Sequence, residues 1–170
     1  MTFIELAKAR YSVRKYLDKQ IESDKLDLIF KAAEVAPTAA NRQPVRFYLL
    51  KSEEARSKIQ EVTKYTFKAP LWILVAYDSD VSWKNKYSDE DKGEIDCAIV
   101  ITHMMLQATE LGLGTCWIGA FDIEKAKDVF NLPVNVIPTA MFPLGYPDPE
   151  MAPSPMHEKR NDVNTVIKEI

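Results

Sequence analysis

The sequence predicts a mixed α+β or α/β layer fold, in which helices pack on a sheet. Segments with apolar residues at helical spacing alternate along the chain with short apolar runs of strand length. No internal repeat or low-complexity segment interrupts this order. The 170 residues also match the usual length of one domain. We therefore expect residues 1–170 to form a single domain.

Composition and charge exclude several classes of protein. The net charge is −3, and the Lys and Arg residues are spread along the chain, so we expect no nucleic-acid partner. The longest apolar run, Leu71 to Tyr77, is only strand-sized, so we expect no membrane partner. Met1 to Ala7 lack the features of a signal peptide, and Cys97 and Cys116 are far apart. We expect a cytoplasmic protein with reduced, buried thiols.

The N-terminal half is expected to contain three helices and two strands. Ser23 is a good cap residue, and Pro37 limits the helix that Ser23 begins. Continuous apolar runs predict the strands, the second of them buried on both faces. The expected helices span 2–9, Ser23 to before Pro37, and 53–65; the expected strands span 47–51 and 71–77.

The C-terminal half continues the alternation after a polar excursion at 78–93. Gly112 is a natural stop for a largely buried helix, and Asp122 is a cap for the next one. Pro138 and Pro143 place the last long strand at an edge or at a bulge. The expected helices span 94–111 and 122–130, and the expected strands span 113–119 and 136–146.

The sequence does not determine what two of its segments, 78–93 and 147–170, pack against. The excursion at 78–93 is read as an exposed loop, although its aromatic residues Trp83 and Tyr87 also allow it to cover a ligand site. Residues 147–170 have too little apolar surface to fold alone, and end in the alternating segment 163–167. We expect this terminal segment to form a strand and the whole extension to pack on a second subunit.

An Arg-x-Ser-x-Arg run stands at the end of the first helix, at Arg10, Ser12 and Arg14. Two guanidinium groups that flank a hydroxyl suit an anionic, planar ligand, because Arg offers a rigid fork of donors. The alternative is that both arginines are simply solvated. A second candidate is the loop from Ala36 to Pro44, whose small residues permit close approach of a flat ligand and whose amides both donate and accept. The alternative there is a rigid connection.

Side chains for catalysis are scarce. The five glycines make neither a dinucleotide fingerprint nor a P-loop, and the two histidines leave little material for a hydrolase triad or a metal site. His103 lies among apolar residues of a helix, which is typical of a core histidine. We assign no side chain a catalytic role and no metal site. A chain with anion-binding groups but few catalytic groups fits an enzyme whose cofactor carries the chemistry.

Four blocks in this order resemble the nitroreductase family of FMN-dependent oxidoreductases. They are the Arg-x-Ser-x-Arg run, the Pro37-Thr38-Ala39-Ala40-Asn41-x-Gln43-Pro44 loop, the helix that begins near Asp96, and Gly112 to Gly119. The similarity runs to about Tyr146. The resemblance implies an α+β sandwich with a central, mostly antiparallel sheet flanked by helices. It also implies an intertwined homodimer that exchanges C-terminal segments and holds FMN at the subunit interface.

The resemblance further implies the cofactor-binding residues, with FMN bound and NAD(P)H as the reductant. The Arg-x-Ser-x-Arg element would bind the flavin phosphate and pyrimidine edge, the loop would reach the flavin of the partner subunit, and the strand end after Thr115 would face the ring. Lys159 and Arg160 resemble a late basic element, with Arg160 preferred. The candidate residues are Arg10, Tyr11, Ser12, Arg14, Pro37, Thr38, Ala39, Asn41, Gln43, Cys116, Trp117, Ile118, Gly119, Lys159 and Arg160.

The expected activity is a ping-pong transfer of hydride from NAD(P)H, through flavin N5, to a flat acceptor such as a nitroaromatic or a quinone. Neither the acceptor nor a choice between NADH and NADPH follows from the sequence. Two alternatives have the same cofactor: an FMN carrier or sensor without turnover, and a specialised enzyme of the dehalogenase or flavin-fragmenting type. A structural dimer with an empty pocket is the remaining alternative.

Overall fold

The computed structural model covers residues 1–170 and has one four-stranded antiparallel sheet of order β1-β2-β4-β3. β1 (Val45–Leu50) pairs with β2 (Leu71–Asp78), β2 pairs with β4 (Val136–Gly145), and β4 pairs with the short β3 (Gly114–Thr115). All three strand pairs are antiparallel. The class is therefore α+β with an antiparallel sheet, as the resemblance implies.

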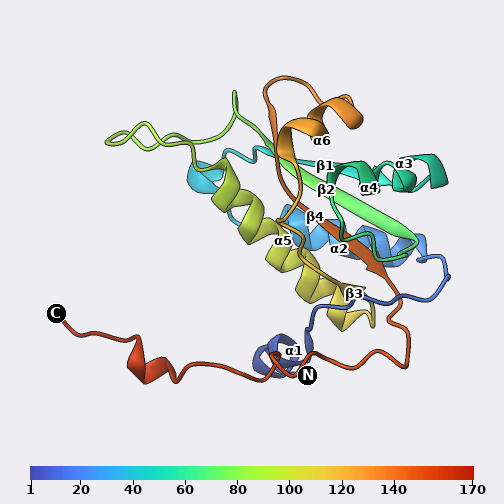
Figure 1. Cartoon of the computed structure of the whole chain (residues 1–170). Coiled ribbons are helices and arrows are strands. Elements are labelled where there is room, and N and C mark those ends of the chain that lie inside the picture. The colour runs from blue at the N-terminus through green and yellow to red at the C-terminus, as the bar shows by residue number, and fades with distance from the viewer.

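Helices cover both faces of this sheet (Figure 1). Side chains alternate along β2, so Ile73 and Val75 join one core cluster while Trp72 and Leu74 join the other. The first cluster lies under α2 (Ser23–Glu34) and α5 (Gly93–Glu110). The second lies under α4 (Ile59–Val62) and α6 (Ile123–Val129). β2 is therefore buried on both faces, which confirms the prediction from its continuous apolar run.

Several helix ends follow from local chemistry. α1 (Phe3–Ala9) begins with a capping box, in which Thr2 Oγ1 accepts from Glu5 N and Glu5 Oε2 accepts from Thr2 N. Asp122 caps α6 as expected, by accepting from Lys125 N. The cap expected at Ser23 was wrong, because Ser23 is the first residue of α2 and no side chain caps that helix. Gly112 has φ +75° directly after α5, which confirms its place as the helix stop.

The expected helix at 53–65 was too long. The chain forms α3 (Glu53–Ser57) and α4, and Thr63 is already extended at φ −150°. The reason is a tertiary contact, because Thr63 Oγ1 donates to Ala120 O at 2.8 Å and so holds the chain away from the helical path. The expected strand at 113–119 is also shorter: only Gly114 and Thr115 pair continuously, and Ile118 makes an isolated bridge to Met141.

The edge position expected for the proline-containing strand was wrong, and the bulge was right. β4 lies inside the sheet, between β2 and β3, and its register with β2 shifts between Val75 and Ala76. Pro138 and Pro143 are tolerated there because β3 pairs only with Leu144 and Gly145. On the side of β4 that faces β3, no strand pairs with either proline, so the missing N–H of proline costs no hydrogen bond there.

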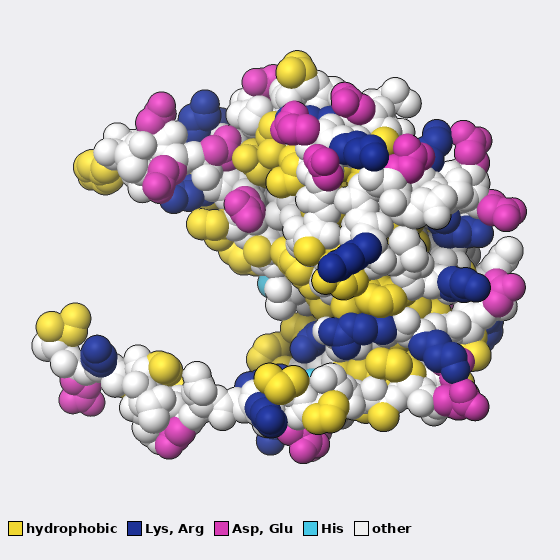
Figure 2. Space-filling model, in the orientation of Figure 1, with side chains coloured by type: hydrophobic (Ala, Val, Ile, Leu, Met, Phe, Trp, Pro, Cys, Tyr) yellow, Lys and Arg dark blue, Asp and Glu magenta, His cyan; other side chains and the backbone are white.

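Two segments extend away from the sheet and helices (Figure 1). The arm, residues 79–92, connects β2 to α5 and is exposed at its tip, which confirms the expected excursion. The tail, residues 147–170, contains the 3-10 helix η2 (Val163–Thr165) near its end. The terminal strand expected at 163–167 was wrong, because Asp162 caps a local turn by accepting from Asn164 N. Figure 2 shows hydrophobic side chains along the hollow between arm and tail.

No helix of the structure combines the length and the apolar character needed to cross a membrane. The two cysteines, Cys97 and Cys116, are free and buried, as expected.

Candidate functional site

The Arg-x-Ser-x-Arg run is an extended segment that packs on β3. Val13 is buried, and its N–H donates to Thr115 O at 2.9 Å, beside a parallel bridge between Ser12 and Thr115. Because side chains alternate in extended backbone, burial of Val13 turns Ser12 and Arg14 to the opposite side. A Cβ at Gly114 would lie 2.5 Å from Val13 Cγ2, so this close packing requires glycine at that position.

The two guanidinium groups of this segment have no ionic partner. Neither Arg10 nor Arg14 lies within 4.0 Å of a carboxylate, and the one hydrogen bond of Arg14 is a long contact of 3.5 Å to Ser12 O. Beside them, Thr115 Oγ1 is buried and has no hydrogen-bond partner. Unpaired cations next to an unsatisfied hydroxyl are typical of a site for an anion.

Cys116 lies next to this segment. Burial raises the pKa of its thiol, while the charge of Arg14, a hydrogen bond with Ser12 and the charge of Arg10 act in the opposite direction. Burial prevails, so the sulfur is a neutral thiol at neutral pH. It therefore serves in packing beside the arginines and is not an activated nucleophile.

The strand end that follows offers backbone donors. Ile118 is buried and exchanges two backbone hydrogen bonds with Met141, at 2.8 and 3.0 Å. The N–H groups of Trp117 and Gly119, on either side of it, have no hydrogen-bond partner in the chain. The Trp117 side chain is 38% exposed, and a Cβ at Gly119 would lie 3.2 Å from the indole nitrogen. This strand end can therefore present amides and an aromatic ring to a flat ligand.

The proline-bracketed loop is held in a strained conformation. Ala40, Asn41 and Gln43 all have φ near +50°, a region that costs a non-glycine residue about 1–2 kcal/mol. Hydrogen bonds to side chains help to hold the loop: Gln43 N donates to Thr38 Oγ1 at 3.0 Å, and Ala39 N donates to Asp96 Oδ1 at 2.8 Å. Backbone strain that the surroundings maintain is a frequent mark of a functional loop.

Asp96 is the residue that sequence reasoning missed as the support of this loop. It lies in the first turn of α5, is 1% exposed, and its second oxygen, Oδ2, has no partner. The signal in the sequence was a carboxylate within an otherwise apolar helix, next to Cys97. A buried carboxylate must be paired or hydrogen-bonded, but the sequence alone does not say by which atom.

The structure places the two candidate regions at opposite ends of α5. The loop contacts the first turn of α5, and the Arg-x-Ser-x-Arg segment packs on β3, which follows the last turn (Figure 1). The 18 residues of α5 give a length of about 27 Å. Residues 10–14 and 116–119 therefore meet within one chain, whereas the loop residues Pro37, Thr38, Ala39, Asn41 and Gln43 do not join them.

The late basic pair also stays apart from the other candidates. The tail follows α1 as far as His157, whose Nε2 lies 2.9 Å from Lys8 O, and Tyr11 Oη donates to Met151 O at 3.4 Å. Lys159 and Arg160 come after these contacts and are exposed. Arg160 donates to Lys159 O at 2.8 Å and has no carboxylate partner. Their role toward a ligand stays a prediction.

A comparison with family models matches the nitroreductase family at residues 7–68 and 64–146. These ranges include most of the chain and all four of the sequence blocks. The chain belongs to the nitroreductase family. The late basic pair, Lys159 and Arg160, lies outside the matched residues.

Individual family members agree with this membership. A Methanothermobacter thermautotrophicus protein, named provisionally as an NADH dehydrogenase/NAD(P)H nitroreductase, is 33% identical over 154 residues, which are 86% of this chain and 78% of that protein. The crystal structure of a nitroreductase family protein from Clostridium difficile 630 has a TM-score of 0.91 and 36% identity over 99% of this chain and 98% of that one.

A more distant structure was determined with FMN bound. A protein from Exiguobacterium sibiricum, named provisionally as a nitroreductase and crystallised in complex with FMN, has a TM-score of 0.86 at 20% identity. The alignment covers all of this chain and 98% of that one. At this identity the likeness establishes the shared fold.

Proposed function

We propose that this chain is an NAD(P)H-dependent oxidoreductase that binds FMN and reduces a flat acceptor such as a nitroaromatic or a quinone. The observation that carries the proposal is the pair of unpaired guanidinium groups, Arg10 and Arg14, beside the unsatisfied Thr115 hydroxyl. Membership of the nitroreductase family and the FMN-bound structure of the same fold support the choice of ligand. Bound FMN would supply the redox chemistry, by taking a hydride from NAD(P)H and passing two electrons to the acceptor.

The residues of the Arg-x-Ser-x-Arg segment fit both charged parts of this cofactor. A guanidinium pairs with phosphate through two parallel N–H donors, and Ser12 and Thr115 supply neutral hydroxyls beside it. A second guanidinium at the pyrimidine edge of the ring would stabilise negative charge that reduction places there. Because Arg10 and Arg14 have no carboxylate partner in the chain, neither must lose an ion pair when the ligand binds.

The strand end at 116–119 would position the ring. The free N–H groups of Trp117 and Gly119 are donors for ring heteroatoms, and the buried Ile118 fixes the backbone between them. Tyr11 lies at the same segment, with its hydroxyl bound to the tail. These residues bind and orient, and none of them needs to change its charge during turnover.

No side chain stands ready as an obligatory acid or base. His103 Nδ1 lies 2.8 Å from Ile99 O, one turn earlier on α5, and the ring of His157 is bound to Lys8 O. Cys116 is held as a neutral thiol by burial. Solvent would therefore deliver protons to the acceptor, which fits an open site in which nucleotide and acceptor bind in turn.

A homodimer would bring the separated candidates together. The loop at 37–43 of one subunit would complete the site that begins with Arg10 and Arg14 of the other, as the resemblance implies. Exposed apolar side chains on three helices give such an interface a surface: Phe3 on α1, Leu28 on α2 and Ile95 on α5 are between 48 and 67% exposed. The tail, which leaves the body after His157, would pack on the partner.

The test is the visible absorption spectrum of the purified protein, recorded anaerobically before and after NADH or NADPH is added. The proposal predicts a flavin spectrum that bleaches with at least one nucleotide and returns when a quinone is added. A flavin spectrum that never bleaches would favour a carrier or sensor. A colourless protein that FMN does not reconstitute would contradict the proposal. Arg14→Ala should lower FMN affinity, and Arg14→Lys should restore part of it.

A further inference from the structure

A groove with excess positive charge lies between the 38–43 loop and the base of the arm. Arg42 lines it from the loop, and Trp83, Lys84 and Lys86 line it from the arm. Its volume of about 480 Å³ falls in the range of small-molecule sites. Asp80 supplies the one carboxylate of the lining. None of the three cations has a carboxylate within 4.0 Å, so their charges are available to a ligand.

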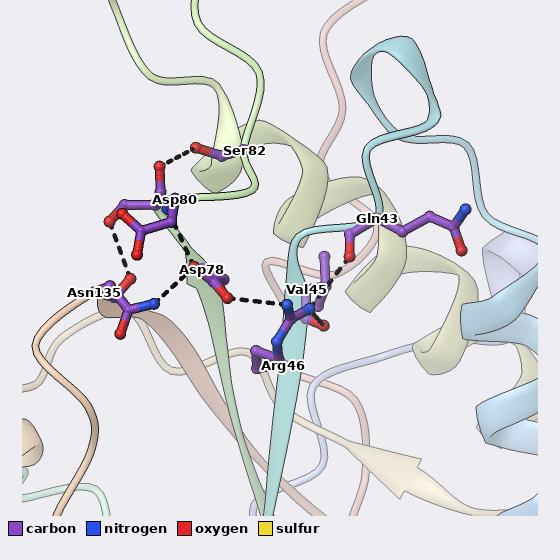
Figure 3. Close-up of polar contacts among 8 residues, drawn as sticks. Gln43, Val45, Arg46, Asp78, Asp80, Ser82 and Asn135 are labelled. Atoms are coloured by element: carbon purple, nitrogen blue, oxygen red, sulfur yellow. Dashed lines mark hydrogen bonds and ion pairs between the residues drawn. The ribbon is translucent and has the colours of Figure 1, made fainter.

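An ion pair between β1 and β2 joins the two segments that carry the walls of the groove (Figure 3). Arg46 Nη2 bonds Asp78 Oδ2 at 3.0 Å, at the end of β2 where the arm begins. Its other terminal nitrogen, Nη1, donates to Gln43 O at 3.3 Å, in the loop. Asp78 also accepts from Asn135 Nδ2 at 2.9 Å and from Asp80 N at 3.1 Å. The loop and the arm are thus joined through one charged pair with only 15% of the Asp78 side chain exposed.

The arm has its own supports near the groove. Ser82 is buried, and its hydroxyl donates to Asp91 Oδ2 at 2.6 Å, which links the outgoing and the returning segment of the arm. Lys92 N donates to Trp83 O at 3.0 Å, which fixes the backbone that carries the indole ring. Trp83 and Lys84 therefore stand on a braced part of the arm, and the groove has its shape before a ligand arrives.

We propose that this groove binds the phosphate-bearing part of NADPH and makes the enzyme prefer NADPH to NADH. The proposal rests on the function proposed above, because the same loop would lie at the flavin of the partner subunit. Arg42 stands between Asn41 and Gln43, the two residues expected to reach that flavin. Because Arg42 adjoins these two residues, a dinucleotide whose nicotinamide stacks on that flavin would need to place its phosphates only a short way further to reach Arg42 and the arm.

The charges of the groove match this ligand. Both nucleotides contain a pyrophosphate, but NADPH has an additional phosphate monoester, which adds about −1.5 to −2 charges near neutral pH. Three cations against one carboxylate favour the more negative nucleotide. Guanidinium binds phosphate in a bidentate manner, and the ammonium groups of Lys84 and Lys86 act as point charges. The Trp83 ring offers a face on which an adenine can stack.

The test compares kcat/KM for flavin reduction by NADPH and by NADH in matched variants. Lys84→Gln/Lys86→Gln and Arg42→Gln should each lower kcat/KM for NADPH about tenfold, and lower it much less for NADH. Asp80→Asn should raise kcat/KM for NADPH, because it removes the one negative charge of the lining. The matched control is Lys51→Gln/Lys125→Gln, which removes two exposed lysines that also lack a carboxylate partner, from outside the groove.

A binding measurement separates this proposal from the proposed function. Calorimetry with adenosine 2′,5′-bisphosphate and with adenosine 5′-monophosphate needs no turnover. The bisphosphate should bind more tightly, and the Arg42 and Lys84/Lys86 variants should lose that difference. If flavin is reduced by both nucleotides but the ratio is the same in wild type and groove variants, the groove proposal is wrong. If neither nucleotide reduces the flavin while the bisphosphate still binds in the groove, the proposed function fails and the groove remains.

Discussion

The two ends of α5 differ in how the chain holds its ligand-binding residues. At the C-terminal end, one backbone hydrogen bond to β3, from Val13 N to Thr115 O, holds the Arg10–Arg14 segment, and the buried Val13 side chain anchors it in the core. At the N-terminal end, one buried carboxylate, Asp96, holds a loop with three residues in left-handed conformation. The first arrangement depends mainly on the apolar packing of Val13. The second depends on hydrogen bonds to polar side chains, one of them a buried carboxylate whose loss leaves a backbone N–H unpaired, so the loop is the more sensitive of the two.

The largest expected effect is therefore at Asp96. Asp96→Ala should lower the free energy of unfolding by about 2–4 kcal/mol, because it leaves the partly buried N–H of Ala39 unpaired and a cavity beneath a strained loop. Asp96→Asn keeps an acceptor for Ala39 N and should cost much less. Urea unfolding of both variants measures the difference. Equal losses would mean that the charge of Asp96, and not its hydrogen bond to the loop, is what stabilises this end.

The matching substitution at the other end is Gly114→Ala. Its Cβ would lie 2.5 Å from Val13 Cγ2, so the Arg10–Arg14 segment must shift, at a cost of about 1–3 kcal/mol and with weaker FMN binding. The double variant Val13→Ala/Gly114→Ala makes room for the new methyl group and should recover part of the FMN affinity. Fluorescence titration with FMN measures both. FMN binding by Gly114→Ala as tight as that of wild type would separate this segment from the site.

The cysteines report on the same two ends. Burial raises the pKa of Cys97 to about 12, and the nearby charges of Asp96 and Glu94 add to that rise. Burial also raises the pKa of Cys116, but Arg14 and Arg10 act against it. In the native protein, Cys116 should therefore be alkylated before Cys97 as the pH rises above 9. Arg14→Ala should reduce the difference between the alkylation rates of the two thiols. Mass spectrometry after timed alkylation gives the order, and Cys97 reacting first would contradict it.

The raised thiol pKa values also set a dependence of stability on pH. A group whose pKa is higher in the folded state stabilises the fold fully below its unfolded pKa, near 9, and loses that contribution as pH rises toward its folded value. For Cys97, stability should thus decline between about pH 9 and pH 12. Cys97→Ala should reduce this slope relative to wild type in urea unfolding at a series of pH values. An unchanged slope would assign the decline to other groups.

The smallest effect is expected for the end of the tail. Removal of residues 158–170 deletes Lys159 and Arg160 but no contact between the tail and α1, so the unfolding of an isolated chain should change little. If the tail packs on a partner, the same deletion should weaken dimerisation. Analytical ultracentrifugation over a concentration series measures this. An unchanged dimer affinity would remove the tail from the interface.

The sequence predicted the elements of the fold better than their arrangement. Periodicity located the helices, and Asp122 and Gly112 marked two helix ends, because these residues act through neighbours a few residues away. The order of strands in the sheet depends on contacts far apart in the chain, so Pro138 and Pro143 suggested an edge that the structure does not have. The helix at 53–65 was overextended for the same reason, since a contact with Ala120 ends it.

The residues of the candidate site could likewise be predicted only where local sequence identifies them. The Arg10–Arg14 segment and Cys116 could be identified from residue types and resemblance, and the structure brings them together. Asp96 and the Arg46–Asp78 pair could not be identified as supports, because each joins residues that are far apart in sequence. Arg42, Lys84 and Lys86 are ordinary surface cations in the sequence. Only the fold shows that they line one groove.

The measurement that most directly tests the two-ended site is FMN binding to a mixed dimer, prepared by co-expression with two different tags. One subunit carries Arg14→Ala, and the other carries Asn41→Gly/Gln43→Gly, which removes the loop side chains but permits positive φ. Each homodimer should bind FMN weakly. If each site combines both subunits, the mixed dimer has one intact site and should bind one FMN with wild-type affinity. If the mixed dimer binds no better than either homodimer, each site lies within one chain and the account is wrong.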